Sequence, residues 1–119
     1  MKKSRISEVP KESAASALFT SEDVYRQPLA PDSTDFNASV VGFGHGVRNK
    51  FHTHTSDQLL IVTHGKGVFA TEGEQVELEP GDVIFSPGGE KHWHGADGEH
   101  DFAHITVTRK DSVTTQHEE

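Results

Sequence analysis

Short runs rich in Val, Ile, Phe and Thr, in which apolar and polar residues tend to alternate, follow one another along most of the chain. These residue types are enriched in β-strands, and alternation with a period of two turns one face of a strand toward the core. No segment repeats apolar residues at the i, i+3, i+4, i+7 spacing over the roughly eleven positions that an amphipathic helix needs. The predicted strands are residues 38–43, 48–54, 58–63, 67–71, 75–79, 83–86, 91–94 and 102–108.

Turn-forming residues separate these runs, as in Pro80-Gly81-Asp82 and Pro87-Gly88-Gly89. Many short strands at even spacing favour an antiparallel sandwich or a small barrel, so the predicted fold class is all-β. Residues 1–17 are polar and lack periodicity, and we expect a flexible N-terminal arm there. A single β-barrel domain is predicted for residues 18–110, and a polar C-terminal tail for residues 111–119.

Composition narrows the functional classes. The chain has 119 residues, no cysteine and a formal charge of −8. Without cysteine there is no disulfide, no thiolate metal ligand and no cysteine nucleophile. The acidic surplus disfavours nucleic acids and anionic membranes as partners, because both bind a basic face. Since no apolar run approaches the ~18 residues of a membrane span, we expect a cytoplasmic protein.

Two pairs of histidines stand at alternate positions, His52 with His54 and His92 with His94. Because residues i and i+2 of a strand point to the same face, each pair aims two imidazoles in one direction. Gln58 opens the next predicted strand, so a tight turn brings it back beside the first pair. Imidazole suits Zn, Mn, Fe, Ni and Cu, whereas Ca or Mg favour several carboxylates. Three imidazoles and one amide oxygen would leave the ion's charge uncompensated, which makes it a strong Lewis acid.

Glycines and a proline at fixed spacing frame both histidine clusters. The first cluster reads G-x5-H-x-H-x3-Q-x6-G from Gly46 to Gly65, and the second reads G-x5-P-x-G-x2-H from Gly81 to His92. Over residues 36–109 the two stretches resemble the two motifs of the cupin superfamily, although the usual pattern has Glu where this chain has Gln58. The resemblance implies a small jelly-roll barrel, a double-stranded β-helix, with metal ligands inside its mouth. The implied ligands are His52, His54, Gln58 and His92.

A narrower resemblance rests on residues 52–54, 58–63, 65–67, 80–83 and 89–96. These stretches are similar to single-domain cupins found with, or fused to, carboxymuconolactone decarboxylases, a group that includes manganese-dependent hydroxynitrile lyases. In that group Gln is the usual fourth ligand, so Gln58 fits an intact site. The resemblance implies Mn or Fe as the metal, and Ni or Zn also suit three imidazoles. It further implies a homodimer paired through N-terminal strands, for which residues 18–30 are the candidate.

The lyase-type cupins also carry a histidine near the metal on the last barrel strand, and the matching residue here is His104. By alternation, His104 shares a face with Thr106, opposite Ile105 and Val107. If Ile105 and Val107 pack between the sheets, His104 faces solvent or a pocket; the family register instead makes it a base in the cavity. Because histidine titrates near ~6.5, His104 and His94 are the candidate catalytic residues. We expect the cavity to be shaped by Val41, Phe43, Phe69 and Phe85.

Three functions are compatible with the sequence. The first is a metal-dependent enzyme that acts on a small oxygenated organic molecule by lyase, isomerase or dioxygenase chemistry. The second is a metal-containing cupin that binds a small molecule, for example as a sensor, without turnover. The third is a dimerisation module for a partner enzyme. The metal ligands are the same in the first two cases, so a base in the cavity is the feature that distinguishes them.

Overall fold

Eleven strands and one short helix make up the structure, a computed structural model that describes residues 1–119. The elements are η1 (Ile6–Glu8), β1 (Glu12–Ser13), β2 (Val24–Pro28), β3 (Phe36–Phe43), β4 (His52–His54), β5 (Gln58–Gly65), β6 (Gly67–Thr71), β7 (Gln75–Leu78), β8 (Val83–Ser86), β9 (His92–Ala96), β10 (Phe102–Arg109) and β11 (Thr114–Gln116). The all-β prediction is confirmed. The structure contains no helix long and apolar enough to cross a membrane.

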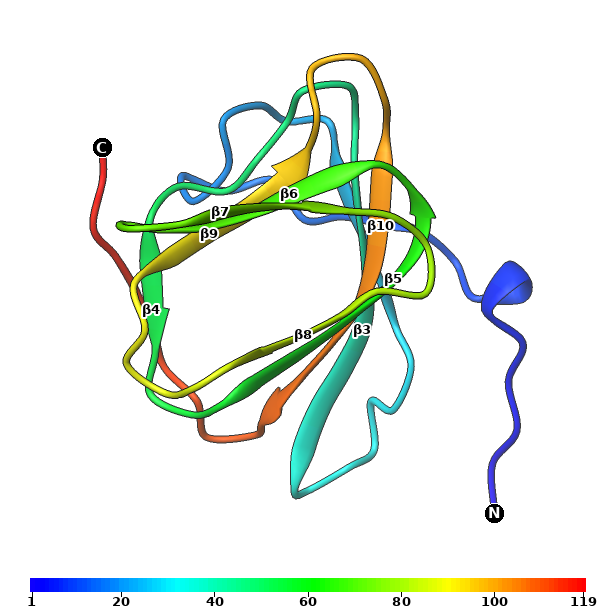
Figure 1. The fold of residues 1–119 in the computed structure, drawn as a ribbon. Helices are drawn as coiled ribbons and strands as arrows, with labels where there is room; N and C mark the ends of the chain where they lie inside the picture. Colours follow the sequence, from blue (N-terminus) through cyan, green and yellow to red (C-terminus); the bar gives the residue numbers. More distant parts are fainter.

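The strands form two antiparallel sheets that face each other. One has the order β1-β2-β3-β10-β5-β8 and the other β11-β4-β9-β6-β7. In Figure 1, β6, β7 and β9 lie above β5 and β8, with β4 closing one side of the barrel and β10 and β3 the other. Antiparallel sheets of this kind turn one face to the core and one outward, so every strand residue has a defined inner or outer position.

Aromatic and aliphatic side chains from both sheets fill the space between them. Phe43, Leu60, Val62 and Phe102 come from the six-stranded sheet, and Phe69 comes from the five-stranded sheet. All five are at most 5% exposed. Burying a side chain of this size stabilises the fold by roughly 1.5–3 kcal/mol. This apolar core adjoins the histidines described below, since Phe43 and Phe69 contact the rings of His92, His94 and His104.

Seven of the eight predicted runs match observed strands closely, and the exception is residues 48–54. Only His52–His54 of that run form a strand, β4. Upstream of it, Arg48 and Asn49 make isolated bridges with Gly95 and Phe19. The bridges keep the backbone extended without forming a continuous ladder, which explains why a longer strand was predicted.

Both terminal segments contact the barrel. At the N-terminus, β1 pairs with β2, and the Gln27 side-chain amide donates hydrogen bonds to the carbonyl oxygens of Ile6 and Val9 at 3.0 and 2.8 Å. The mobility expected for this arm stays a prediction. At the C-terminus, where we expected a polar tail, β11 pairs with β4. Its three residues are all exposed, so its sequence carries no apolar alternation that would predict a strand.

Gly65, at the end of β5, has a φ of +74°, and a Cβ there would lie 2.0 Å from the carbonyl oxygen of Asp101. We expect Gly65→Ala to lower the free energy of unfolding by about 2–3 kcal/mol, since a left-handed backbone and a backbone clash act together. Gly73→Ala is the matched control, because nothing lies within 4 Å of its Cβ position. Urea denaturation of both variants would contradict this account if they lost equal stability.

Candidate metal centre

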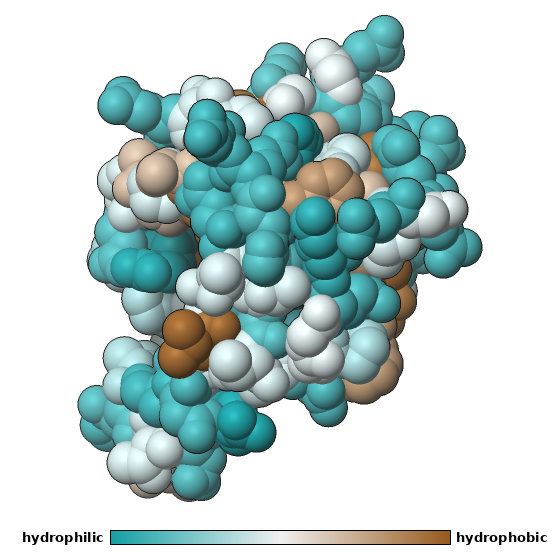
Figure 2. Space-filling model, turned by 90° about the vertical axis from the view of Figure 1, so that its left-hand side faces the viewer, coloured by the Kyte–Doolittle hydropathy of each residue, from teal (hydrophilic) through white to brown (hydrophobic).

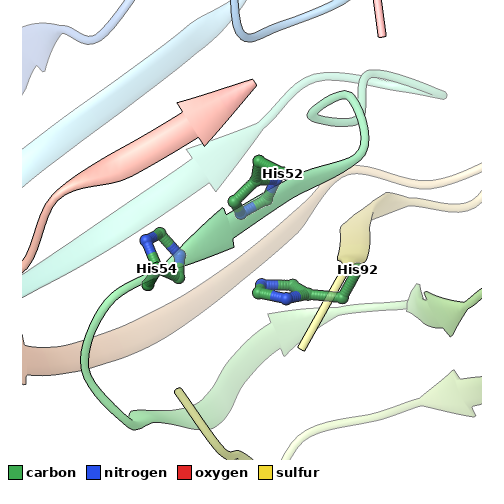
Figure 3. A group of neighbouring side chains, drawn as sticks. All are labelled: His52, His54 and His92. Carbon is green, nitrogen blue, oxygen red and sulfur yellow. The ribbon is translucent and has the colours of Figure 1, made fainter. Parts of the chain in front are cut away.

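Three imidazoles converge between β4 and β9. His52 and His54 lie on β4, and His92 begins β9, where the register pairs it with His52. One ligand nitrogen of each ring lies within 4.8 Å of the others. Figure 3 shows the three rings turned toward one another, as expected for positions i and i+2 on one strand and the facing position on its neighbour.

Backbone carbonyls fix two of these rings. The Nδ1–H of His52 donates to the carbonyl oxygen of Lys50 at 2.6 Å, and that of His92 donates to Glu90 at 2.8 Å. In both cases the acceptor lies two residues upstream. These hydrogen bonds set the tautomer and leave Nε2 with a lone pair, the arrangement usual for metal-ligating histidines.

The third ring is fixed by a side chain. Nδ1 of His54 lies 2.9 Å from the hydroxyl oxygen of Thr114 on β11. Its Nε2 is buried and has no hydrogen-bond partner. A buried polar atom without a partner costs about 1–3 kcal/mol, and a cation bound to this nitrogen would remove that cost.

Gln58 reaches the histidines from the opposite sheet. Its side-chain NH₂ donates to the hydroxyl of Thr106 at 2.8 Å, and its amide oxygen lies 3.1 Å from Nε2 of His92. When His92 is neutral, both of these facing atoms are hydrogen-bond acceptors. A shared cation would satisfy both, so the donor set comprises three nitrogens and one oxygen. All four residues expected as metal ligands are thus brought together.

Burial keeps these imidazoles uncharged. Desolvation is the largest cause in each case and lowers the pKa of His52 to about 3 and that of His54 to about 4. It also lowers the pKa of His92. Metal ligation requires the neutral form of histidine. Near pH 7, therefore, protons do not compete with a cation for these nitrogens.

Two further histidines, His94 and His104, lie side by side in the interior. Their ring centroids are 4.8 Å apart in a T-shaped arrangement, and both residues are at most 3% exposed. Phe43 contacts both rings. Desolvation lowers the pKa of His104 to about 4 and that of His94 well below its ordinary value, so both rings are neutral near pH 7.

Asn49 determines the tautomer of His94. Its side-chain oxygen accepts the backbone N–H of His94 at 2.8 Å, so its NH₂ group faces Nε2 of the same residue at 3.1 Å. Nε2 is therefore an acceptor and the ring proton lies on Nδ1. Nδ1 of His94 and both ring nitrogens of His104 are buried without hydrogen-bond partners.

The structure decides between the two orientations considered for His104. It pairs with Val41 and Val62, points between the sheets and is 0% exposed, while Ile105 and Val107 face outward. The orientation toward solvent was wrong. The expectation for Phe85 was also wrong, because it is 63% exposed on the outer face of β8 and lines no interior cavity.

Two residues that fix histidines were missed in the sequence. Asn49 precedes β4 in an irregular stretch, and Thr114 lies about sixty residues from the ring it contacts. A buried asparagine within the first histidine cluster has no distinguishing sequence signal. Thr114 stands in a stretch that resembles a tail by composition.

Comparisons with known proteins agree with this architecture. A family model described as a cupin domain matches residues 39–108. (R)-mandelonitrile lyase from Granulicella tundricola is 42% identical over 82 residues, which cover 68% of this chain and 63% of that protein. Acireductone dioxygenase from Bacillus thuringiensis is 43% identical over 49 residues, 37% of this chain and 29% of that one. The chain thus spans less than two thirds of the length of these curated relatives.

Solved structures show the same fold. A cupin-like protein from Thermotoga maritima superposes with a TM-score of 0.82 at 29% identity, covering 89% of this chain and 84% of that one. The polyketide cyclase RemF from Streptomyces resistomycificus gives 0.86 at 17% identity, covering 98% and 84%, and supports the fold alone. With a family model covering more than half of its residues and the two-sheet barrel that the motifs imply, the chain belongs to the cupin family.

Proposed function

We propose that this protein is a metal-dependent enzyme that acts on a small oxygenated organic molecule, by lyase chemistry in preference to isomerase or dioxygenase chemistry. The observation that carries the proposal is the arrangement of five neutral imidazoles in one interior. Three of them, with Gln58, form a metal-type donor set. The other two imidazoles, those of His94 and His104, lie outside that donor set. Nδ1 of His94 and both ring nitrogens of His104 have no hydrogen-bond partner.

The residues that would hold the metal are His52, His54, Gln58 and His92. All four are uncharged near pH 7, so a bound ion would keep its full +2 charge and supply Lewis-acid polarisation of an oxygen. Mn or Fe is the proposed metal on the family resemblance. Ni and Zn also suit this donor set, because imidazole binds them well.

His94 and His104 have complementary proton-transfer properties. Because Asn49 donates to Nε2 of His94, the Nδ1–H of His94 is a hydrogen-bond donor. His104 is neutral, carries one lone pair on its ring and is completely buried. We assign His104 as the base that accepts a proton and His94 as the donor. General acid–base catalysis of this kind contributes roughly 100- to 10,000-fold to a rate.

The similarity to (R)-mandelonitrile lyase supports a cyanohydrin as the substrate class. In the cleavage of a cyanohydrin, the hydroxyl proton passes to the base, the carbonyl double bond forms and the bond to the nitrile carbon breaks. The departing cyanide then takes up a proton, which the Nδ1–H of His94 can provide, and transfer from His104 restores the pair. Phe43 contacts the rings of both His94 and His104, and Phe69 contacts that of His94, so an aromatic or aliphatic substituent would find apolar surroundings. The cytoplasmic location remains a prediction.

Metal content tests the donor set. Protein reconstituted with Mn²⁺ and freed of excess ion should retain about one ion per chain by elemental analysis, because the neutral donors are already gathered. His92→Ala should lose most of this metal. His64→Ala is the control, since His64 is exposed and contacts Asp101 instead. Equal metal in the two variants, at equal folding by circular dichroism, would rule out the assigned ligands.

Turnover tests the assigned base. With mandelonitrile as the probe, the Mn²⁺-loaded protein should release benzaldehyde. His104→Ala should lower kcat/KM roughly 100- to 10,000-fold while keeping the metal. His45→Ala, which changes an exposed histidine, should leave kcat/KM unchanged. If the unaltered protein bound mandelonitrile without converting it, this result would contradict the proposal that the protein is an enzyme. It would favour a metal-containing sensor instead.

A further inference from the structure

Strand β4, which carries two of the proposed ligands, is joined unequally to its two neighbours in the five-stranded sheet. On one edge its ladder with β9 consists of the single pair His52↔His92. On the other edge it pairs with β11 along its whole length, from Thr114↔His54 to Gln116↔His52. The backbone position of β4 therefore depends mainly on the C-terminal strand.

Hydrogen bonds fasten this strand at both ends. At one end, the backbone N–H of Thr55 donates to the carbonyl of Val113 at 3.1 Å, and the N–H of Val113 donates to the hydroxyl of Thr55 at 2.9 Å. At the other, the N–H of His117 donates to the carbonyl of Phe51 at 2.8 Å. We call residues 113–118 the C-terminal clamp.

Glu118 connects the clamp to the second ligand strand. One carboxylate oxygen accepts the backbone N–H of Phe51 at 2.7 Å, and the two oxygens accept both guanidinium NH₂ groups of Arg48 at 3.2 and 2.9 Å. The guanidinium in turn lies over the ring of Trp93, 4.7 Å from its centroid. Trp93 stands between His92 and His94 on β9, so a single carboxylate links both strands that carry ligands.

The clamp also reaches a ligand ring directly, through the 2.9 Å contact between the Thr114 hydroxyl and Nδ1 of His54. Figure 2 looks onto the side of the barrel that carries β4 and the C-terminus, and most of this surface is hydrophilic. A polar, exposed strand gains little from apolar burial here. The contacts of β11 with β4 are mostly polar, and β4 is the strand that carries two of the proposed ligands.

We propose that the C-terminal clamp sets the geometry and the affinity of the metal centre, with Thr114 as the positioning residue for His54. The proposal rests on the proposed function in that His52, His54 and His92 hold the ion. By accepting the Nδ1–H of His54, Thr114 keeps the lone pair on Nε2, which faces the other ligands. Without that hydroxyl the ring is free to rotate or to adopt the opposite tautomer.

Thr114→Val removes the hydroxyl with little change in shape, and Thr115→Val is the matched control, because the structure gives the Thr115 hydroxyl no hydrogen bond. Measured by calorimetry with Mn²⁺, Thr114→Val should weaken binding by about 10- to 100-fold, as loss of a hydrogen bond to a ligand does. Thr115→Val should bind like the unaltered protein. If the two variants bound Mn²⁺ with equal affinity, the proposed role of the C-terminal clamp would be overturned, while the assignment of the metal ligands would stand.

A measurement on the metal-free protein tests the positioning role of Thr114 separately from the proposed function. Imidazole ¹⁵N spectra of the metal-free protein should show His54 as the Nδ1–H tautomer, and Thr114→Val should lose that single state. If the unaltered protein binds no Mn²⁺ but the tautomer behaves in this way, the proposed function fails and the positioning by Thr114 stands. If His54 keeps the same tautomer in the variant, the positioning role is wrong.

Discussion

Histidine side chains buried without charge impose the main constraint on this molecule. Five imidazoles lie between two apolar sheets, and desolvation holds their pKa values below the ordinary range. A neutral imidazole still needs a donor or an acceptor at each ring nitrogen. The backbone, Asn49 and Thr114 meet part of that need. Nε2 of His54, Nδ1 of His94 and both ring nitrogens of His104 are buried without a partner, and a cation and a polar substrate would complete this arrangement.

The fold and most of the candidate site follow from alternation along the strands. A period of two places His52 with His54 and His92 with His94 on common faces, and a tight turn returns Gln58 to the first pair. The same rule puts His104 on the face opposite Ile105, but it does not say which face is inside. That choice depends on which neighbouring strands pair with β10, and β3 and β5 lie far from it in the sequence.

What the sequence could not predict depends on partners that are distant in the chain. Strand β11 is polar and fully exposed, so only the unpaired edge of β4 makes it a strand. Asn49 is buried because it exchanges two hydrogen bonds with His94, about forty-five residues away. Its side-chain NH₂ donates to Nε2 of His94, and its side-chain oxygen accepts the backbone N–H of His94. Phe85 is a residue type expected in the wall of a cavity. Its neighbour Ser86 faces inward, however, so Phe85 faces outward. Residue type alone does not distinguish these cases.

The central claim is that three imidazoles and one carboxamide bind the same ion. X-ray absorption spectroscopy of the Mn²⁺-loaded protein measures this most directly, because imidazole rings give a characteristic multiple-scattering signal that water and carboxylate ligands lack. We predict three imidazoles per manganese in the unaltered protein and two in His54→Ala. A first coordination shell of oxygen atoms alone, or a spectrum unchanged by His54→Ala, would contradict the account.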